Sequence, residues 1–229
     1  FEDDRRHTES GDMDNMHQPV RYHQDVLRAM NLQEILVAAL SIDYNIAFKG
    51  SICSPQDKIK SREQLVHAQR KLVEVLEVFV KGNTENQAIV FHHLPELRRH
   101  MGPLAVPKVW PADFTEEHRG LVAISPGLNT EEVIIECLRG NVKLCQSHTP
   151  RDLIEAFGEL LNKQPDPTDC PDLEFFSIMC LPNGFHDTSE NTKPLSRNQD
   201  AVLDVLLSDR LHNLKACIEN LFALGADSS

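Results

Sequence analysis

The sequence predicts an all-α fold, an armadillo-like helical solenoid of about ten helices. Apolar residues recur three and four positions apart in stretch after stretch, which is the period of a helix with one buried face. Stretches of alternating apolar and polar residues, the mark of a half-buried strand, are absent from the sequence. Because a one-sided helix must be covered by another, short helices joined by polar turns favour a stacked arrangement. The sequence contains no strict repeat of fixed length, so any repeat is degenerate.

The 229 residues suit one large domain with a lead-in. Residues 1–19 are polar and acidic and carry no periodic apolar face, so we expect a flexible lead-in. Residues 20–229 form the predicted armadillo-like helical domain. Within it, residues 103–129 are rich in proline and predict a loop. The chain's one tryptophan, Trp110, lies in this loop, and we expect it to dock the loop onto the body of the domain.

The clearest helix is expected to begin after Ser61 and to continue to about Lys81, where Gly82 ends it. Residues 43–60 before it, which include Pro55, are interpreted as a polar connector. An apolar run at residues 173–181 is compatible with a strand or a buried helix, and its helical surroundings favour the helix.

Two four-residue patterns predict capping boxes, in which a side chain at the helix start and one three residues later satisfy the free backbone amides. The first pairs Asn31 with Glu34, and the second pairs Thr84 with Gln87. Both patterns therefore predict where a new helix begins.

The net charge of −12 argues against nucleic acid and against anionic membrane surfaces, both of which bind Lys/Arg patches. No apolar run approaches the roughly 20 residues of a membrane span, so we expect no membrane insertion of this segment. The six cysteines lack a C-x-x-C pair, which favours free thiols in a reducing compartment. The sequence does not begin with methionine, from which we expect a piece of a larger protein.

No pattern in the sequence predicts catalysis, a cofactor or a metal site. His92, His93 and His100 lack the i, i+4 spacing of a zinc-binding helix, and Pro95 interrupts them. Nucleophile elbows, phosphate-binding glycine loops and EF-hand loops are all absent from the sequence. An enzyme is therefore not expected.

Three segments carry a resemblance to a known family: YHQDVLRAMNLQEI at 22–35, GNTENQAIVFHHL at 82–94 and EVIIECLRGN at 132–141. In this order and spacing they resemble the RIH domain, the homology domain shared by ryanodine receptors and inositol trisphosphate receptors, and the spacing is nearer the latter. The resemblance covers about residues 16–207 and centres on the pair Asn86 and Gln87, its structural signature. We expect this pair to cap a helix and satisfy a turn, and a ligand role is the alternative.

The resemblance implies a cytosolic helical coupling domain of an intracellular ligand-gated calcium-release channel, on the cytosolic face of the endoplasmic reticulum. Its implied partners are other domains of the same large channel and neighbouring subunits. Inositol phosphate binding by this segment is not expected, because the loop at 162–169 is acidic and no β-rich part is present. The alternative function is an armadillo-like adaptor that binds a partner peptide or protein.

Overall fold

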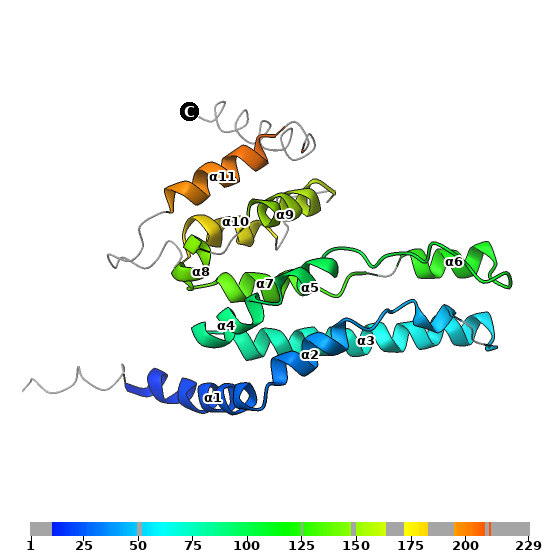
Figure 1. Ribbon diagram of the computed structural model, residues 1–229, viewed down its shortest axis with the longest axis horizontal. Coiled ribbons are helices and arrows are strands. Elements are labelled where there is room, and N and C mark those ends of the chain that lie inside the picture. The colour runs from blue at the N-terminus through cyan, green and yellow to red at the C-terminus, as the bar shows by residue number, and fades with distance from the viewer. Residues whose placement is uncertain are drawn as a thin grey trace, which may run out of the picture. The chain divides into compact units, whose positions relative to one another are not determined.

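A computed structural model describes residues 11–49, 52–124, 126–147, 150–163, 172–182, 195–208 and 211 of the chain, with the side chains from residue 20 onward. Every regular element in these ranges is a helix, and none is a strand (Figure 1). The predicted all-α fold class is confirmed. The sequence also predicts a last helix after Asp209 that ends at Gly225, and apart from Leu211 this helix lies outside the described residues.

The chain divides into two compact units, residues 1–133 and 134–229. Unit 1 contains α1 (Gly11–Ala29), α2 (Leu32–Leu40), the short 3-10 helix η1 (Ile46–Phe48), α3 (Pro55–Val80), α4 (Thr84–Phe91), α5 (Leu94–Arg99) and α6 (Glu116–Ala123). Unit 2 contains α8 (Val142–Ser147), α9 (Arg151–Lys163), α10 (Leu173–Cys180) and α11 (Ser196–Leu206). The boundary falls inside α7 (Thr130–Leu138). The expected limit between a lead-in and a domain at residue 20 stays a prediction, and α1 begins at Gly11.

Helix α3 begins seven residues earlier than predicted, because its cap is Ser54 rather than Ser61. The Ser54 hydroxyl accepts a hydrogen bond from the backbone N–H of Asp57, 3.2 Å away. Pro55 occupies the first helical position, where its missing N–H removes no intrahelical bond. The sequence interpretation was wrong here because it treated this proline as part of a connector.

Neither helix start is the capping box that the sequence predicts. Asn31 adopts the left-handed conformation, with φ 55°, and its side chain makes no cap bond. The tight link from α1 to α2 is closed instead by the backbone N–H of Glu34, which donates to the Asn31 carbonyl at 3.2 Å. At the start of α4 the cap is Asn83 rather than Thr84, because the Asn83 Oδ1 accepts from the backbone N–H of Asn86.

The proline-rich segment 103–129 is more ordered than a loop, since it contains α6. Thr115 and His118 form a capping box at the start of this helix. Around it lies a small apolar cluster, separate from the main core of the unit, made of Ile59, Phe114 and Val122 with Phe48 and Trp110 packed against it. The ring centroids of Trp110 and Phe48 are 6.0 Å apart, so the tryptophan docks this segment as expected.

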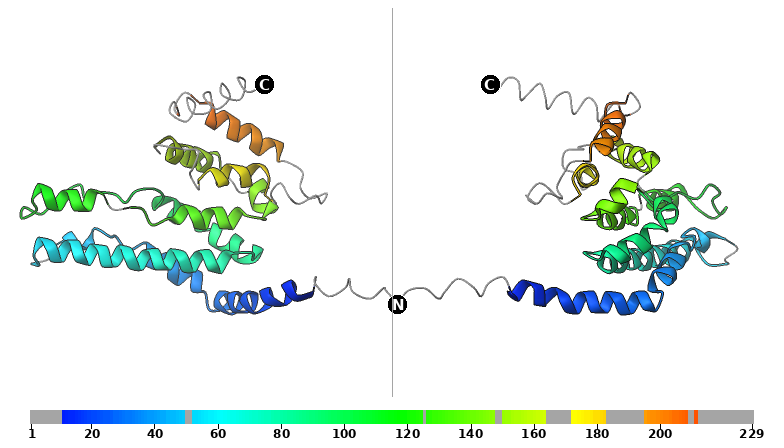
Figure 2. Two further views of the ribbon diagram at one scale, coloured as in Figure 1. Left: turned by 180° about the vertical axis from the view of Figure 1, so that it is seen from behind. Right: turned by 60° about the vertical axis from the view of Figure 1, so that its left-hand side comes forward.

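The two units have cores of different character. In unit 1, α3 presents one buried face along its length and packs against α2, α4 and α6 (Figure 2). In unit 2, the rings of Phe157 on α9 and Phe175 on α10 stack with centroids 3.8 Å apart, and both are fully buried. The apolar run at 173–181 is therefore a buried helix, as favoured from the sequence.

Candidate functional site

Asn86 is the third residue of α4, and its side chain lies next to the C-terminal end of α3. Its side chain is 0% exposed, and its Nδ2 donates to the Phe79 carbonyl at 2.9 Å. Phe79 lies in the last turn of α3, where helix carbonyls have no intrahelical partner. Asn86 therefore satisfies a helix end that would otherwise be buried unpaired.

The turn between α3 and α4 is built by Gly82 and Asn83. Gly82 has φ 66°, a left-handed conformation that glycine adopts readily after a helix. Asn83 is buried, and besides capping α4 its Nδ2 donates to Gln24 Oε1 at 3.3 Å and to Asp25 Oδ1 at 3.2 Å. The turn thus presents amide groups toward α1.

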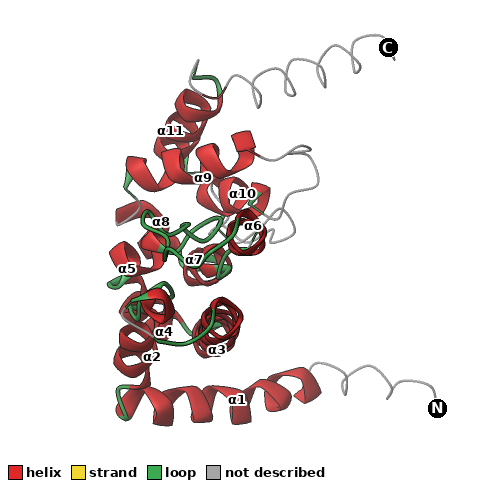
Figure 3. Cartoon of the chain, turned by 90° about the vertical axis from the view of Figure 1, so that its right-hand side faces the viewer, coloured by secondary structure: helices red, strands yellow, loops and turns green. Residues whose placement is uncertain are grey.

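Helix α1 is held against this turn by its polar side chains. Arg28 Nη1 donates to Asn86 Oδ1 at 2.9 Å, and the same guanidinium pairs with Glu85 at 2.7 Å. Gln24 Nε2 donates to the carbonyls of Val78, at 2.8 Å, and Lys81, at 3.0 Å. Figure 3 shows α1 lying across the edge of unit 1, next to α2 and α3. We refer to Gln24, Arg28, Asn83 and Asn86 as the amide corner.

The sequence signature Asn86–Gln87 lies in the interior of unit 1, with Gln87 only 1% exposed. Neither side chain is open to solvent in this structure. The position of the pair favours the expected structural role over the ligand role.

A second asparagine makes an equivalent bond in unit 2. Asn198 is the third residue of α11 and is followed by Gln199, as Asn86 is followed by Gln87. Its Nδ2 donates to the carbonyl of Met179 at 2.9 Å and to that of Cys145 at 3.0 Å. Met179 is the penultimate residue of α10, as Phe79 is of α3. Sequence reasoning missed this role of Asn198, although the repeated Asn-Gln pair near a helix start was the available signal.

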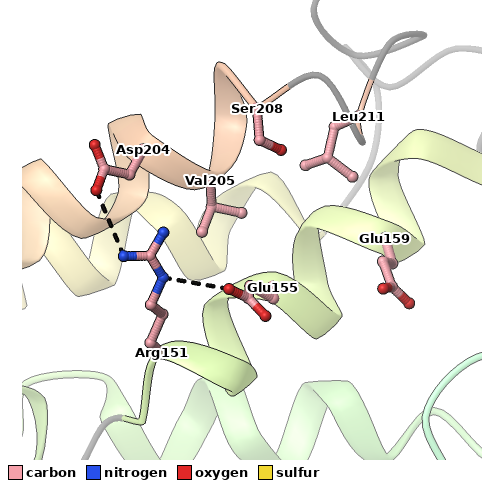
Figure 4. Close-up of a pocket in the computed structure, with 7 residues that line it drawn as sticks. All are labelled: Arg151, Glu155, Glu159, Asp204, Val205, Ser208 and Leu211. Atoms are coloured by element: carbon pink, nitrogen blue, oxygen red, sulfur yellow. Dashed lines mark hydrogen bonds and ion pairs between the residues drawn. The ribbon is translucent and has the colours of Figure 1, made fainter.

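Unit 2 also contains a small cavity between α9 and α11, with a volume of about 190 Å³ (Figure 4). Its lining residues are Arg151, Glu155, Glu159, Asp204, Val205, Ser208 and Leu211. Arg151 Nε contacts Glu155 Oε1 at 3.2 Å, and Arg151 Nη1 lies 3.5 Å from Asp204 Oδ2. The cavity is therefore predominantly acidic, with two apolar side chains on its wall. No pattern in the sequence indicated this cavity, because its lining residues come from segments that are distant in the chain.

Burial perturbs the pKa values of the two buried thiols and of one of the histidines among the described residues. Burial raises the pKa of the Cys145 thiol to about 12 and raises the pKa of Cys137 as well, so both remain protonated and unreactive at neutral pH. His93 contacts Glu34 at 3.3 Å, and burial lowers the pKa of His100. Among the described residues, no three histidine, cysteine or carboxylate side chains are placed to hold a metal ion.

These features define a helical domain. Its sequence signature, Asn86 and Gln87, is buried where α4 packs against the end of α3. The RIH-domain family model matches residues 2–214, and the chain belongs to this family. RIH domains are found in the ryanodine and inositol trisphosphate receptor calcium channels. Comparisons with curated proteins and with solved structures gave no match. Within the described part of the chain, no helix combines the length and the apolar character needed to cross a membrane.

Proposed function

We propose that this chain is a cytosolic coupling domain of an intracellular ligand-gated calcium-release channel, similar to an inositol trisphosphate receptor. In this role it transmits conformational change between the ligand-binding region and the pore. Its partners are other domains of the same channel and neighbouring subunits, at the cytosolic face of the endoplasmic reticulum. It carries out no catalysis and binds no cofactor.

The observation that carries this proposal, beside the family membership, is the amide corner. Coupling over a distance needs packed elements whose contacts are directional, so that displacement of one helix displaces the next. Hydrogen bonds from Gln24 and Arg28 fix α1 to the end of α3 and the start of α4 with defined geometry. Such a joint transmits a rotation of α1 to α3, which extends over 26 residues.

The electrostatics of the chain support a mechanical role over inositol phosphate binding. A polyphosphate site needs several arginine or lysine side chains converging on one point. Here the net charge is −12, and the basic side chains described above are engaged with carboxylates, such as Arg28 with Glu85 and Arg151 with Glu155.

The first test is to read the parent transcript on both sides of this segment. We expect the reading frame to continue into a group of hydrophobic spans toward the carboxyl end. A frame that closes soon after Ser229, without such spans, would replace the channel proposal with that of an armadillo-like adaptor for a partner peptide or protein.

The second test is functional and uses the full-length parent protein in vesicles. We expect Asn86→Ala to reduce ligand-evoked calcium release while ligand binding to the parent protein stays unchanged. Unchanged release, with the α1 contacts shown to be lost, would contradict a coupling role for the corner.

A further inference from the structure

Helix α1 contributes no buried apolar side chain to unit 1 within residues 20–29, the part of it whose side chains are described. Its one buried side chain there is Gln24, which is 5% exposed, whereas Tyr22 is 68% and Val26 is 40% exposed. Among the described residues, the buried apolar core of unit 1 begins only at Leu36 on α2. Because most helices in proteins are stabilised by packing of an apolar face, α1 lacks the usual contribution to its stability.

Polar side chains connect α1 to the rest of unit 1. Gln24 and Asp25 form hydrogen bonds with the end of α3 and the turn that follows it, and Arg28 donates to Asn86. Arg28 also forms an ion pair with Glu85 of α4, at 2.7 Å, and the Glu85 side chain is 68% exposed. The net contribution of such hydrogen bonds is modest, since bonds to water replace them, and exposed ion pairs contribute little. Helix α1 is therefore held less strongly than a helix with a buried apolar face.

The link between α1 and α2 is short and is closed by backbone hydrogen bonds. Asn31 has a left-handed conformation, with φ 55°, and its side chain makes no cap bond. The backbone N–H of Asn31 donates to the Arg28 carbonyl at 2.9 Å, and that of Glu34 donates to the Asn31 carbonyl at 3.2 Å. Met30 and Asn31 are both exposed, so a rotation about this link displaces no buried side chain of the link itself.

We propose that α1 undocks from unit 1 as a single unit, by rotation about Asn31, while α2 to α6 remain folded. The undocked form exposes Asn83, Asn86 and the carbonyl groups at the end of α3 to water. Openings of part of a protein have lower free energies than global unfolding, and segments with few buried apolar contacts open first. The inference goes beyond the proposed function, because a helix that undocks in this way would serve a channel domain and an adaptor alike.

The test is native-state hydrogen exchange of the whole chain, followed by NMR at increasing low concentrations of denaturant. A 19-residue helix without tertiary contacts is marginally stable in water, so the backbone amides of α1 exchange whenever it undocks. We expect the amides of residues 20–29 to share one opening, which is populated at least about tenfold more than the opening of residues 73–80 of α3. The denaturant dependence of this opening should be smaller, because less surface becomes exposed. The side-chain amide protons of Asn83, which bond to Gln24 and Asp25, should exchange through the same opening.

Ionic strength and a variant that removes one charge test the contact between Arg28 and Glu85. Raising the salt concentration to about 1 M shortens the Debye length to about 3 Å, so we expect the opening of α1 to become up to about fivefold more populated. Arg28→Gln keeps a side-chain donor and removes the charge, so it should open α1 by a similar factor at low salt and abolish the response to salt. The matched control is Arg99→Gln, which removes the same charge from an exposed ion pair within α5 and should leave the salt response of α1 unchanged.

The proposal would be overturned by equal protection and equal denaturant dependence in α1 and α3, because α1 would then open only with global unfolding. That result would leave the proposed coupling role standing, since α1 would stay fixed to α3. Protection that rises residue by residue from one end of α1 would also overturn the proposal, because such a gradient indicates fraying. A salt response in Arg28→Gln equal to that of the wild type would contradict the assignment of Arg28 as the charged contact that holds α1. Circular dichroism of each variant confirms that the helices remain folded.

Discussion

The two asparagines that follow a helix end, Asn86 in unit 1 and Asn198 in unit 2, make the same local bond in different surroundings. Each is the third residue of its helix and donates to the carbonyl of the penultimate residue of the preceding helix. Asn86 is fully buried under α1 and receives a hydrogen bond from Arg28, whereas Asn198 is only half-buried. Water can replace a lost hydrogen bond at an exposed site but not at a buried one. The burial of each asparagine therefore decides how much its hydrogen bond contributes to stability.

Replacement of Asn86 with alanine should have the largest effect. It leaves the Phe79 carbonyl without this partner in a buried place, and it removes one bond of the Arg28 guanidinium, whose side chain is 24% exposed. We expect a loss of about 3 kcal/mol in the free energy of unfolding of unit 1. Chemical denaturation followed by circular dichroism measures it. A loss below about 1 kcal/mol would mean that water enters the corner and that the bonds are replaceable.

Arg28→Met should have the next largest effect, because it keeps a long apolar stem and removes the charge. The variant loses the bond to Asn86 and the contact with Glu85, which is itself exposed. We expect a loss of about 1–2 kcal/mol. The effects of Arg28→Met and Asn86→Ala should be non-additive, since the two side chains share a bond. Additive effects in the double variant would show that their bond contributes nothing.

Asn198→Ala should destabilise unit 2 by only about 1 kcal/mol, because the hydrogen bonds of Asn198 are only partly buried, whereas the bond from Asn86 to the Phe79 carbonyl is fully buried. The measurement is the same denaturation series. A loss of stability as large as that of Asn86→Ala would show that burial under α1 does not determine the contribution of these asparagines.

The smallest effect concerns pH and His100, which is also in unit 1. Burial, opposed by Glu96 and assisted by Arg99, lowers the pKa of His100 below its ordinary value. The unfolded chain therefore binds this proton more readily, and the free energy of unfolding should fall as the pH drops below about 6.5. The slope is at most about 1.4 kcal/mol per pH unit.

His100→Phe, which keeps a ring against Tyr44, should remove this part of the pH dependence. His67→Gln, at an exposed position of α3, is the control and should leave the slope unchanged. Equal pH profiles for wild type and His100→Phe would exclude His100 as the group responsible.

Local pattern predicted the helical class and several boundaries correctly. The stop at Gly82 follows from glycine at a left-handed position, and the helix at 173–180 follows from an apolar run in helical surroundings. The start of α3 was not predicted, because proline marks helix starts as well as turns and the sequence alone does not separate the two uses. Helix α6 was not predicted, because the prolines on both sides of it indicated a loop.

The amide corner could be predicted only in part. Asn86 and Gln87 were recognised as a signature, but their partners on α1 were not. Gln24 bonds to Val78, 54 residues further along the chain, and polar residues on a helix ordinarily indicate its solvent face. Here the polar side of α1 faces inward, so only the tertiary structure reveals the joint.

Amide hydrogen exchange across α1 tests most directly whether Asn86 connects α1 to the end of α3. In Asn86→Ala we expect the amides of residues 20–29 to lose about a hundredfold of protection, which corresponds to about 3 kcal/mol of local stability, while those of α9–α11 stay unchanged. Asn198→Ala should leave α1 unaffected. Unchanged protection of α1 in Asn86→Ala would contradict the claim that Asn86 holds α1 against α3 and α4. It would also contradict the coupling role proposed for this domain.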